Sequence, residues 1–136
     1  MTETYTGRCQ CGAVRYEINK KPQTVHACHC TECQKRSGSA FGLTMIVERD
    51  SFAVQGELAS YIRTSDNDTK VISYFCPNCG NPIYGELERS PDILALRPGT
   101  LDDTKWFKLD RMIWADSAQS WVEFSDKIET LPKGRW

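Results

Sequence analysis

The chain has 136 residues and is nearly neutral, with 17 Lys and Arg against 18 Asp and Glu. This length predicts a single domain, residues 1–136, and the charge balance excludes the long basic stripe typical of a nucleic-acid binder. The hydrophobic content of 40% fits a folded protein, and no apolar run approaches the roughly 20 residues that a membrane span requires. The polar residues 1–6 lack the apolar centre of a signal peptide, so we expect a cytoplasmic protein with neither nucleic acid nor membrane as a partner.

Short β-prone segments follow one another along the chain, and turn formers such as Gly56 and Asp66-Asn67-Asp68 separate them. Segment 14–18 alternates apolar and charged residues, which indicates a strand with one face in water. We expect one helical turn at 31–36, ended by Ser37-Gly38-Ser39. Aromatic residues are frequent in 112–114 and 121–124. Strands are expected at 5–8, 14–18, 24–27, 41–47, 52–54, 60–63, 71–75, 83–87 and 93–97. The pattern predicts a mainly β domain without a long helix.

All seven cysteines fall into three short clusters, so none is left over as an isolated core residue. The clusters are Cys9-x-Cys11, Cys28-x-Cys30-x-x-Cys33 and Cys76-x-x-Cys79. An odd number of cysteines cannot all pair with one another. In a reducing compartment, clustered thiols more often bind a metal than form disulfides.

The two outer pairs together offer four thiolates, the closed tetrahedral set of a structural zinc site. Cys9 and Cys11 lie on the same face of an extended backbone. Between Cys76 and Cys79, Pro77 sets the first turn dihedral, and Gly80 tolerates the backbone angles that follow. The alternative is two disulfides or a redox Cys-x-x-Cys, which the lack of a surrounding βαβ pattern disfavours.

The central cluster has three cysteines and no fourth. Catalytic zinc keeps one position open, so such a site could admit water or the thiolate of a small substrate. Two alternatives remain open: a nearby His26, His29 or Glu32 could close the site, or the three thiols could carry no metal. An extended backbone would point His29 away from the sulfurs, whereas His26, two residues before Cys28, is better placed.

With these motifs the chain resembles the glutathione-dependent formaldehyde-activating enzyme family, which also includes centromere protein V. The resemblance covers essentially the whole chain and includes the order of all seven cysteines. Met112 and Ala118 depart from it, because the family often has histidine and lysine there. The motifs that carry the resemblance are Gly7-x-Cys9-x-Cys11-Gly12, Cys28-His29-Cys30-x-x-Cys33-Gln34-Lys35, Ser37-Gly38-Ser39-Ala40-Phe41, Phe75-Cys76-x-x-Cys79-Gly80, Gly99-Thr100-Leu101-Asp102-Asp103 and Ile113-Trp114, the last followed by Ser117 and Trp121.

The resemblance implies a β-tent fold of several small coiled antiparallel sheets stapled by zinc. It also implies two zinc ions per chain: a structural ion on the four outer cysteines and a second, which could be only partly occupied, on catalytic Cys28, Cys30 and Cys33. The function implied is that of a carbon–sulfur lyase acting on a glutathione–aldehyde or other thiol–aldehyde adduct, similar to S-(hydroxymethyl)glutathione synthase. The alternative is a non-catalytic zinc module that carries glutathione or binds a protein partner. The oligomeric state is left open.

Four further residues have two interpretations each. Lys35 and Arg36 follow the central cluster and could meet a glutathione carboxylate, or they could be ordinary solvated surface. Trp114 and Trp121 could line a substrate pocket, although we expect both to belong to the core.

Overall fold

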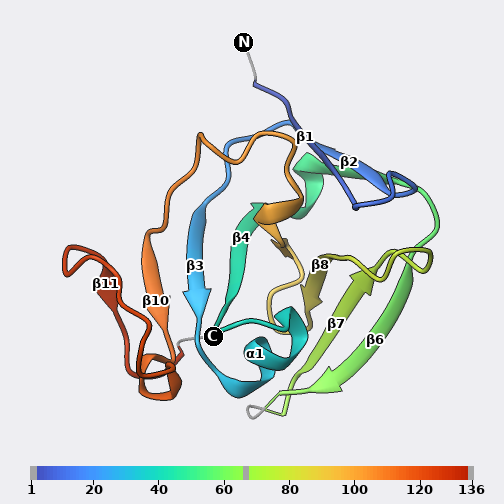
Figure 1. Cartoon of the computed structure of the whole chain (residues 1–136). Helices are drawn as coiled ribbons and strands as arrows, with labels where there is room; N and C mark the ends of the chain where they lie inside the picture. The colour runs from blue at the N-terminus through green and yellow to red at the C-terminus, as the bar shows by residue number, and fades with distance from the viewer. Residues whose placement is uncertain (1–2, 66–67, 135–136) are drawn as a thin grey trace. The chain divides into compact units, whose positions relative to one another are not determined.

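The computed structural model describes residues 3–65 and 68–134, so part of the turn expected at 66–68 and the first two residues lie outside the described residues. It is mainly β, as predicted. The elements in chain order are β1 (Tyr5–Arg8), β2 (Arg15–Ile18), β3 (Thr24–Cys28), α1 (Thr31–Ser37), β4 (Gly42–Glu48), η1 (Arg49–Ser51), β5 (Phe52–Gln55), β6 (Ala59–Thr64), β7 (Lys70–Phe75), β8 (Pro82–Leu87), β9 (Ile93–Leu96), η2 (Pro98–Thr100), β10 (Arg111–Ile113), η3 (Ala115–Ser117) and β11 (Glu129–Thr130). Figure 1 shows their succession along the chain.

The contacts divide the chain into two compact units. Unit 1 comprises Met1–Gln23 and Met45–Trp106, and unit 2 comprises Thr24–Thr44 and Phe107–Trp136. The chain passes from unit 2 into unit 1 within β4. That residues 1–136 form a single domain stays a prediction.

Unit 1 contains two antiparallel sheets. In the smaller sheet β2 pairs with β1 on one side and with β5 on the other. In the other sheet the order is β4, β9, β8, β7 and β6, with a register shift at Tyr74 and Phe75 just before Cys76. In β2, Tyr16 and Ile18 are buried while Arg15 and Glu17 face water, which confirms the alternation expected from the sequence.

Unit 2 is built on β3, which pairs with β10, and β10 in turn pairs with β11 (Figure 1). Both pairings are parallel, a departure from the purely antiparallel sheets expected. Parallel neighbours need a long connection, and more than eighty residues separate β3 from β10 in the chain. The second aromatic-rich segment, 121–124, lies outside any strand. Each helix that the structure describes is too short and too polar to reach across a bilayer.

Candidate metal centres

Two turns in unit 1 bring the four outer cysteines together. Cys9 follows β1, and its turn is closed by hydrogen bonds from the Gly12 N–H to the Cys9 carbonyl (3.1 Å) and from the Cys9 N–H to the Val14 carbonyl (3.0 Å). Cys76 follows β7, and the Gly80 N–H donates to the Cys76 carbonyl at 2.7 Å. Gly80 has a φ of 76°, a left-handed conformation that glycine adopts without strain.

A hydrogen bond between the two turns fixes their mutual position, because the Gln10 N–H donates to the Asn81 side-chain oxygen at 2.9 Å. The sulfur of Cys11 lies 3.6 Å from that of Cys9 and 3.7 Å from that of Cys76. All four sulfurs lie within 4.8 Å of one another. A tetrahedron with zinc–sulfur bonds of about 2.3 Å has sulfur–sulfur edges of about 3.8 Å. The four-cysteine cluster, Cys9, Cys11, Cys76 and Cys79, therefore has dimensions that fit zinc.

The electrostatics of the four-cysteine cluster favour the thiolate form of Cys9, Cys11 and Cys79. They oppose it at Cys76: although a hydrogen bond from the Cys79 backbone lowers its pKa, burial and the hydrogen bonds with the Cys11 and Cys79 thiols leave this pKa raised to about 11. Burial raises the pKa of Cys9, but the Val14 N–H, which donates to its sulfur at 3.3 Å, and the thiols of Cys76 and Cys79 outweigh burial and leave this pKa lowered. A backbone hydrogen bond from Cys11 is the main cause that lowers the pKa of Cys79. All seven cysteines of the chain are free thiols in the structure, so neither disulfides nor an oxidised Cys-x-x-Cys is present among them.

The three-cysteine cluster, Cys28, Cys30 and Cys33, lies in unit 2 where β3 runs into α1. Cys28 ends β3, Cys30 is the N-cap of α1, and Cys33 lies in the first turn of the helix. The Cys33 N–H donates to the Cys30 sulfur at 3.3 Å, which turns this sulfur toward the helix. All three sulfurs lie within 4.8 Å of one another.

No ligand atom of a fourth His, Cys, Asp or Glu joins this cluster among residues 3–65 and 68–134. Glu32 is exposed. His29 is only 1% exposed, and its ring packs between Phe41 and Phe124, with ring centroids 5.5 and 5.7 Å away. Burial lowers the pKa of His29, so its imidazole is neutral at pH 7. Neither ring nitrogen of His29 joins the three sulfurs, in agreement with the orientation expected from the sequence.

The three sulfurs share their protons unequally. Hydrogen bonds from Cys28 and Cys33 lower the pKa of Cys30, whereas hydrogen bonds to Cys30 and Cys33 raise the pKa of Cys28. The Cys30 thiol therefore ionises first, and the thiols of Cys28 and Cys33 donate hydrogen bonds that stabilise its thiolate. A divalent cation stabilises all three as thiolates, so this donor set fits a soft divalent metal such as zinc.

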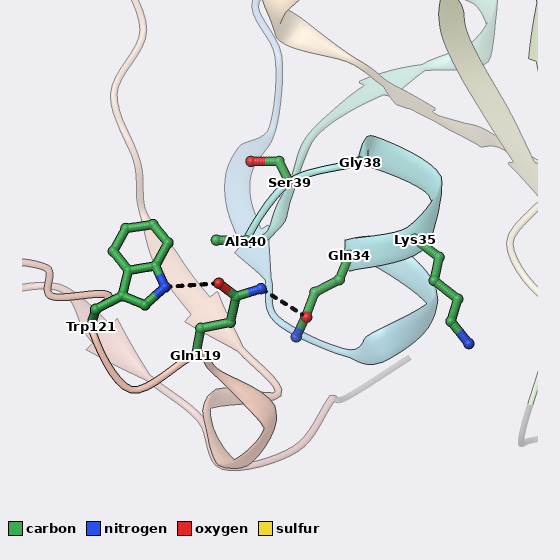
Figure 2. Close-up of a pocket in the computed structure, with 7 residues that line it drawn as sticks. All are labelled: Gln34, Lys35, Gly38, Ser39, Ala40, Gln119 and Trp121. Carbon is green, nitrogen blue, oxygen red and sulfur yellow. Dashed lines mark hydrogen bonds between the residues drawn. The ribbon is translucent and has the colours of Figure 1, made fainter.

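A hydrogen-bonded row of side chains, called the amide row, begins next to Cys33 on α1 and consists of Gln34, Gln119 and Trp121. The Gln34 side-chain N–H groups donate to the His29 carbonyl (2.7 Å) and to the Ser117 carbonyl (3.0 Å). Gln119 donates to the Gln34 side-chain oxygen at 3.2 Å, and the Trp121 indole N–H donates to Gln119 at 2.9 Å. Figure 2 shows this row. Gln34 belongs to the central motif that carries the family resemblance, although the sequence indicates no role for it, and nothing in the sequence singles out Gln119.

The same row lines an open pocket of about 500 Å³ in unit 2, shown in Figure 2. Its lining contains no cysteine and consists of Gln34, Lys35, Gly38, Ser39, Ala40, Gln119 and Trp121. Trp121 is 71% exposed, so the expectation that it belongs to the core is wrong. Trp114 is half-buried, with the Lys133 ammonium 5.4 Å from its ring centre.

The family model described as "Glutathione-dependent formaldehyde-activating enzyme" matches residues 4–117. The chain belongs to this family. The match includes all seven cysteines of both clusters. It ends at Ser117, whose carbonyl accepts a hydrogen bond from the Gln34 side chain. Membership of the glutathione-dependent formaldehyde-activating enzyme family confirms the resemblance found in the sequence.

Two curated relatives carry the family's name provisionally. A Penicillium rubens protein is 34% identical over 84 residues, which are 60% of this chain and 44% of the relative. An Emericella nidulans protein is 30% identical over 82 residues, which are 59% of this chain and 41% of the relative. The chain thus spans less than half the length of these relatives. A crystal structure of a Rhodobacter sphaeroides protein has a similar fold, with a TM-score of 0.57, 19% identity, and coverage of 71% of this chain and 87% of that one.

Proposed function

We propose that this protein is a zinc-dependent enzyme of the carbon–sulfur lyase type, similar to S-(hydroxymethyl)glutathione synthase, that acts on the adduct of glutathione or another thiol with an aldehyde. The observation that carries the proposal is the difference between the two clusters. One offers four sulfurs, a complete tetrahedral set, whereas the other offers three and no fourth ligand atom from the described residues. Closed sets are typical of structural zinc, and sets of three protein ligands are typical of catalytic zinc.

In this proposal the chain binds two zinc ions, and each cluster has its own task. The four-cysteine cluster ties the turn after β1 to the turn after β7 and contributes to folding. Cys28, Cys30 and Cys33 hold the second ion beside α1. When bound there, zinc keeps a thiol deprotonated at neutral pH, and because three thiolates make it a weak Lewis acid, it activates sulfur rather than the carbonyl group.

The reaction proposed involves no oxidation or reduction. The thiolate sulfur forms a bond to the carbonyl carbon of formaldehyde, the π electron pair of the carbonyl moves onto its oxygen, and the proton released by the thiol ends on that oxygen. The reverse reaction breaks the same carbon–sulfur bond. The role of this chain's residues is to hold the thiol in place: the cysteines supply the binding site, and Gln34 fixes the loop that carries Cys28 and Cys30.

The proposal also includes a reducing compartment such as the cytoplasm, since seven free thiols would not persist in an oxidising one. The partner is a small thiol.

NMR exchange spectroscopy on glutathione and formaldehyde tests this function. Zinc-loaded protein should accelerate exchange between free glutathione and its hydroxymethyl adduct, and Cys30→Ser should remove the acceleration while leaving the fold intact. Binding of glutathione without acceleration would instead identify a carrier. The absence of both binding and acceleration, with two zinc ions present, would refute the proposal.

A further inference from the structure

Arg36 has an unsatisfied charge next to the three-cysteine cluster. It is half-buried, and its Nη2 is enclosed without a hydrogen-bond partner among the residues that the structure describes. The ion pairs found in the described chain do not include it. A buried guanidinium nitrogen without an acceptor costs free energy, because it has given up water and gained nothing in return.

The helix geometry places this charge on the side of the cluster. Residues three apart on a helix are neighbours, with Cβ atoms about 5–6 Å apart, so Cys33 and Arg36 lie on one face of α1. The hydrogen bond with Cys28 lowers the pKa of Cys33, but the hydrogen bond with Cys30 and burial leave it raised, and the positive charge of Arg36 acts against that rise. Gln34 and Lys35 are among the residues that line the pocket of Figure 2, and Lys35 is exposed. Of the two adjacent cations, Arg36 is the one that lies three positions after Cys33 on the helix.

The space next to Cys33 on α1 is also restricted by the neighbouring backbone. A Cβ at Gly42 would come within 3.3 Å of the Cys33 Cβ and 3.8 Å of its sulfur, so the backbone at the start of β4 runs close to this cysteine. A small thiol whose sulfur enters the cluster would therefore have few directions in which to extend. A planar guanidinium with free N–H groups is suited to accept a carboxylate, often through two parallel hydrogen bonds.

We propose that Arg36 determines specificity at the three-cysteine cluster: it binds the carboxylate of a thiol acid whose sulfur occupies the cluster. The proposal rests on the proposed function, because it requires that a substrate thiol reaches this cluster. It narrows the substrate class to thiols that carry a carboxylate within reach of the sulfur, glutathione among them.

A different role for the same charge would be to balance the thiolates of the cluster. That role predicts that loss of the charge weakens the binding of zinc and of every thiol alike. Carboxylate recognition predicts that only thiols with a carboxylate are affected. A pair of probes that differ in charge alone, 3-mercaptopropionate and 3-mercaptopropionamide, therefore separates the two roles.

Isothermal titration calorimetry of these two probes against zinc-loaded protein is the test, with zinc content measured on every sample. The unaltered chain should bind the acid at least about tenfold more tightly than the amide, which corresponds to about 1.4 kcal/mol. Arg36→Gln should reduce this ratio to within about twofold while keeping two zinc ions and the same affinity for the amide. Lys35→Gln, the matched control on the neighbouring residue, should keep the full ratio.

A retained tenfold preference in Arg36→Gln would overturn the proposal, and so would an equal loss of affinity for acid and amide. Arg36→Lys gives an independent check if Arg36→Gln does not fold, because it keeps the charge but loses the paired donors and should retain only part of the preference. If neither probe binds the zinc-loaded wild-type chain, this inference fails, whereas the glutathione exchange measurement decides separately on the proposed function. Binding of both probes without a preference refutes the inference alone.

Discussion

Replacing Gln34 with leucine tests whether the amide row braces the three-cysteine cluster. The substitution keeps a side chain of similar bulk, one bond shorter, but removes three hydrogen bonds, which join Gln34 to the His29 carbonyl, the Ser117 carbonyl and the Gln119 amide. His29 is almost fully buried, so water cannot easily replace the lost donor at its carbonyl. Ser117 and Gln119 are half-buried and can recover part of their hydrogen bonding from water.

The expected loss follows from these exposures. Leaving one buried acceptor without a donor costs about 1–3 kcal/mol, and each partly exposed hydrogen bond contributes about 0.5–1.5 kcal/mol. We therefore expect Gln34→Leu to lower the free energy of unfolding by about 2–4 kcal/mol, a large share of the roughly 5–15 kcal/mol typical of a domain. Because His29 lies between Cys28 and Cys30, the three-cysteine cluster should also release zinc to a chelator faster than in the unaltered chain.

Urea unfolding followed by circular dichroism measures the first effect, and absorbance of a chromogenic chelator measures the second. Gln119→Leu is the matched control. It removes only the two outer hydrogen bonds of the row, both partly exposed, and leaves no buried acceptor without a donor, so it should cost about 1 kcal/mol, the lower end for two such bonds. Our reasoning would be refuted if Gln34→Leu cost no more than Gln119→Leu, or if zinc release were unchanged.

Three further predictions concern the metal clusters, and a fourth concerns the partly buried hydrogen bond between Tyr74 and Glu86. Cys76→Ser should leave the chain unfolded by circular dichroism, because structural zinc contributes about 10–16 kcal/mol to small zinc domains, more than most domains can lose; a well-folded variant with one zinc fewer would contradict this. Cys30→Ser should stay folded, lose one zinc ion by elemental analysis and lose activity, and its unfolding would argue against a purely catalytic cluster. A limiting amount of chelator should remove one ion before the other and abolish activity before circular dichroism changes, whereas simultaneous loss of both signals would count against separate roles. A hydrogen bond to Glu86 raises the pKa of Tyr74 to about 12, so its stabilising contribution is complete below pH 10 and is lost as the pH rises through about 12. Absorbance titration of tyrosine at high pH should show this late step, and Glu86→Gln should shift it toward pH 10; an unchanged step would show that Glu86 is not its cause.

Local chemistry explains why much of this protein could be predicted from its sequence. Strand β2 was predicted because a two-residue alternation is a property of the segment itself, and α1 because Gly38, its left-handed C-cap, ends the helical pattern. Membership of the three cysteines in one cluster follows from their spacing, since a strand end and a helical turn cannot carry Cys28, Cys30 and Cys33 far apart.

Only the tertiary structure decided which distant residues meet. The sulfurs of Cys11 and Cys76 approach within 3.7 Å across 65 positions of sequence, and their separate motifs would read the same if each bound its own metal. Gln34 finds the Ser117 carbonyl across 83 positions, and the long return of the chain allows β10 to run parallel to β3. Exposure is likewise a property of the assembled chain, because an indole is as apolar at the surface as in a core, and only the structure shows that Trp121 is 71% exposed.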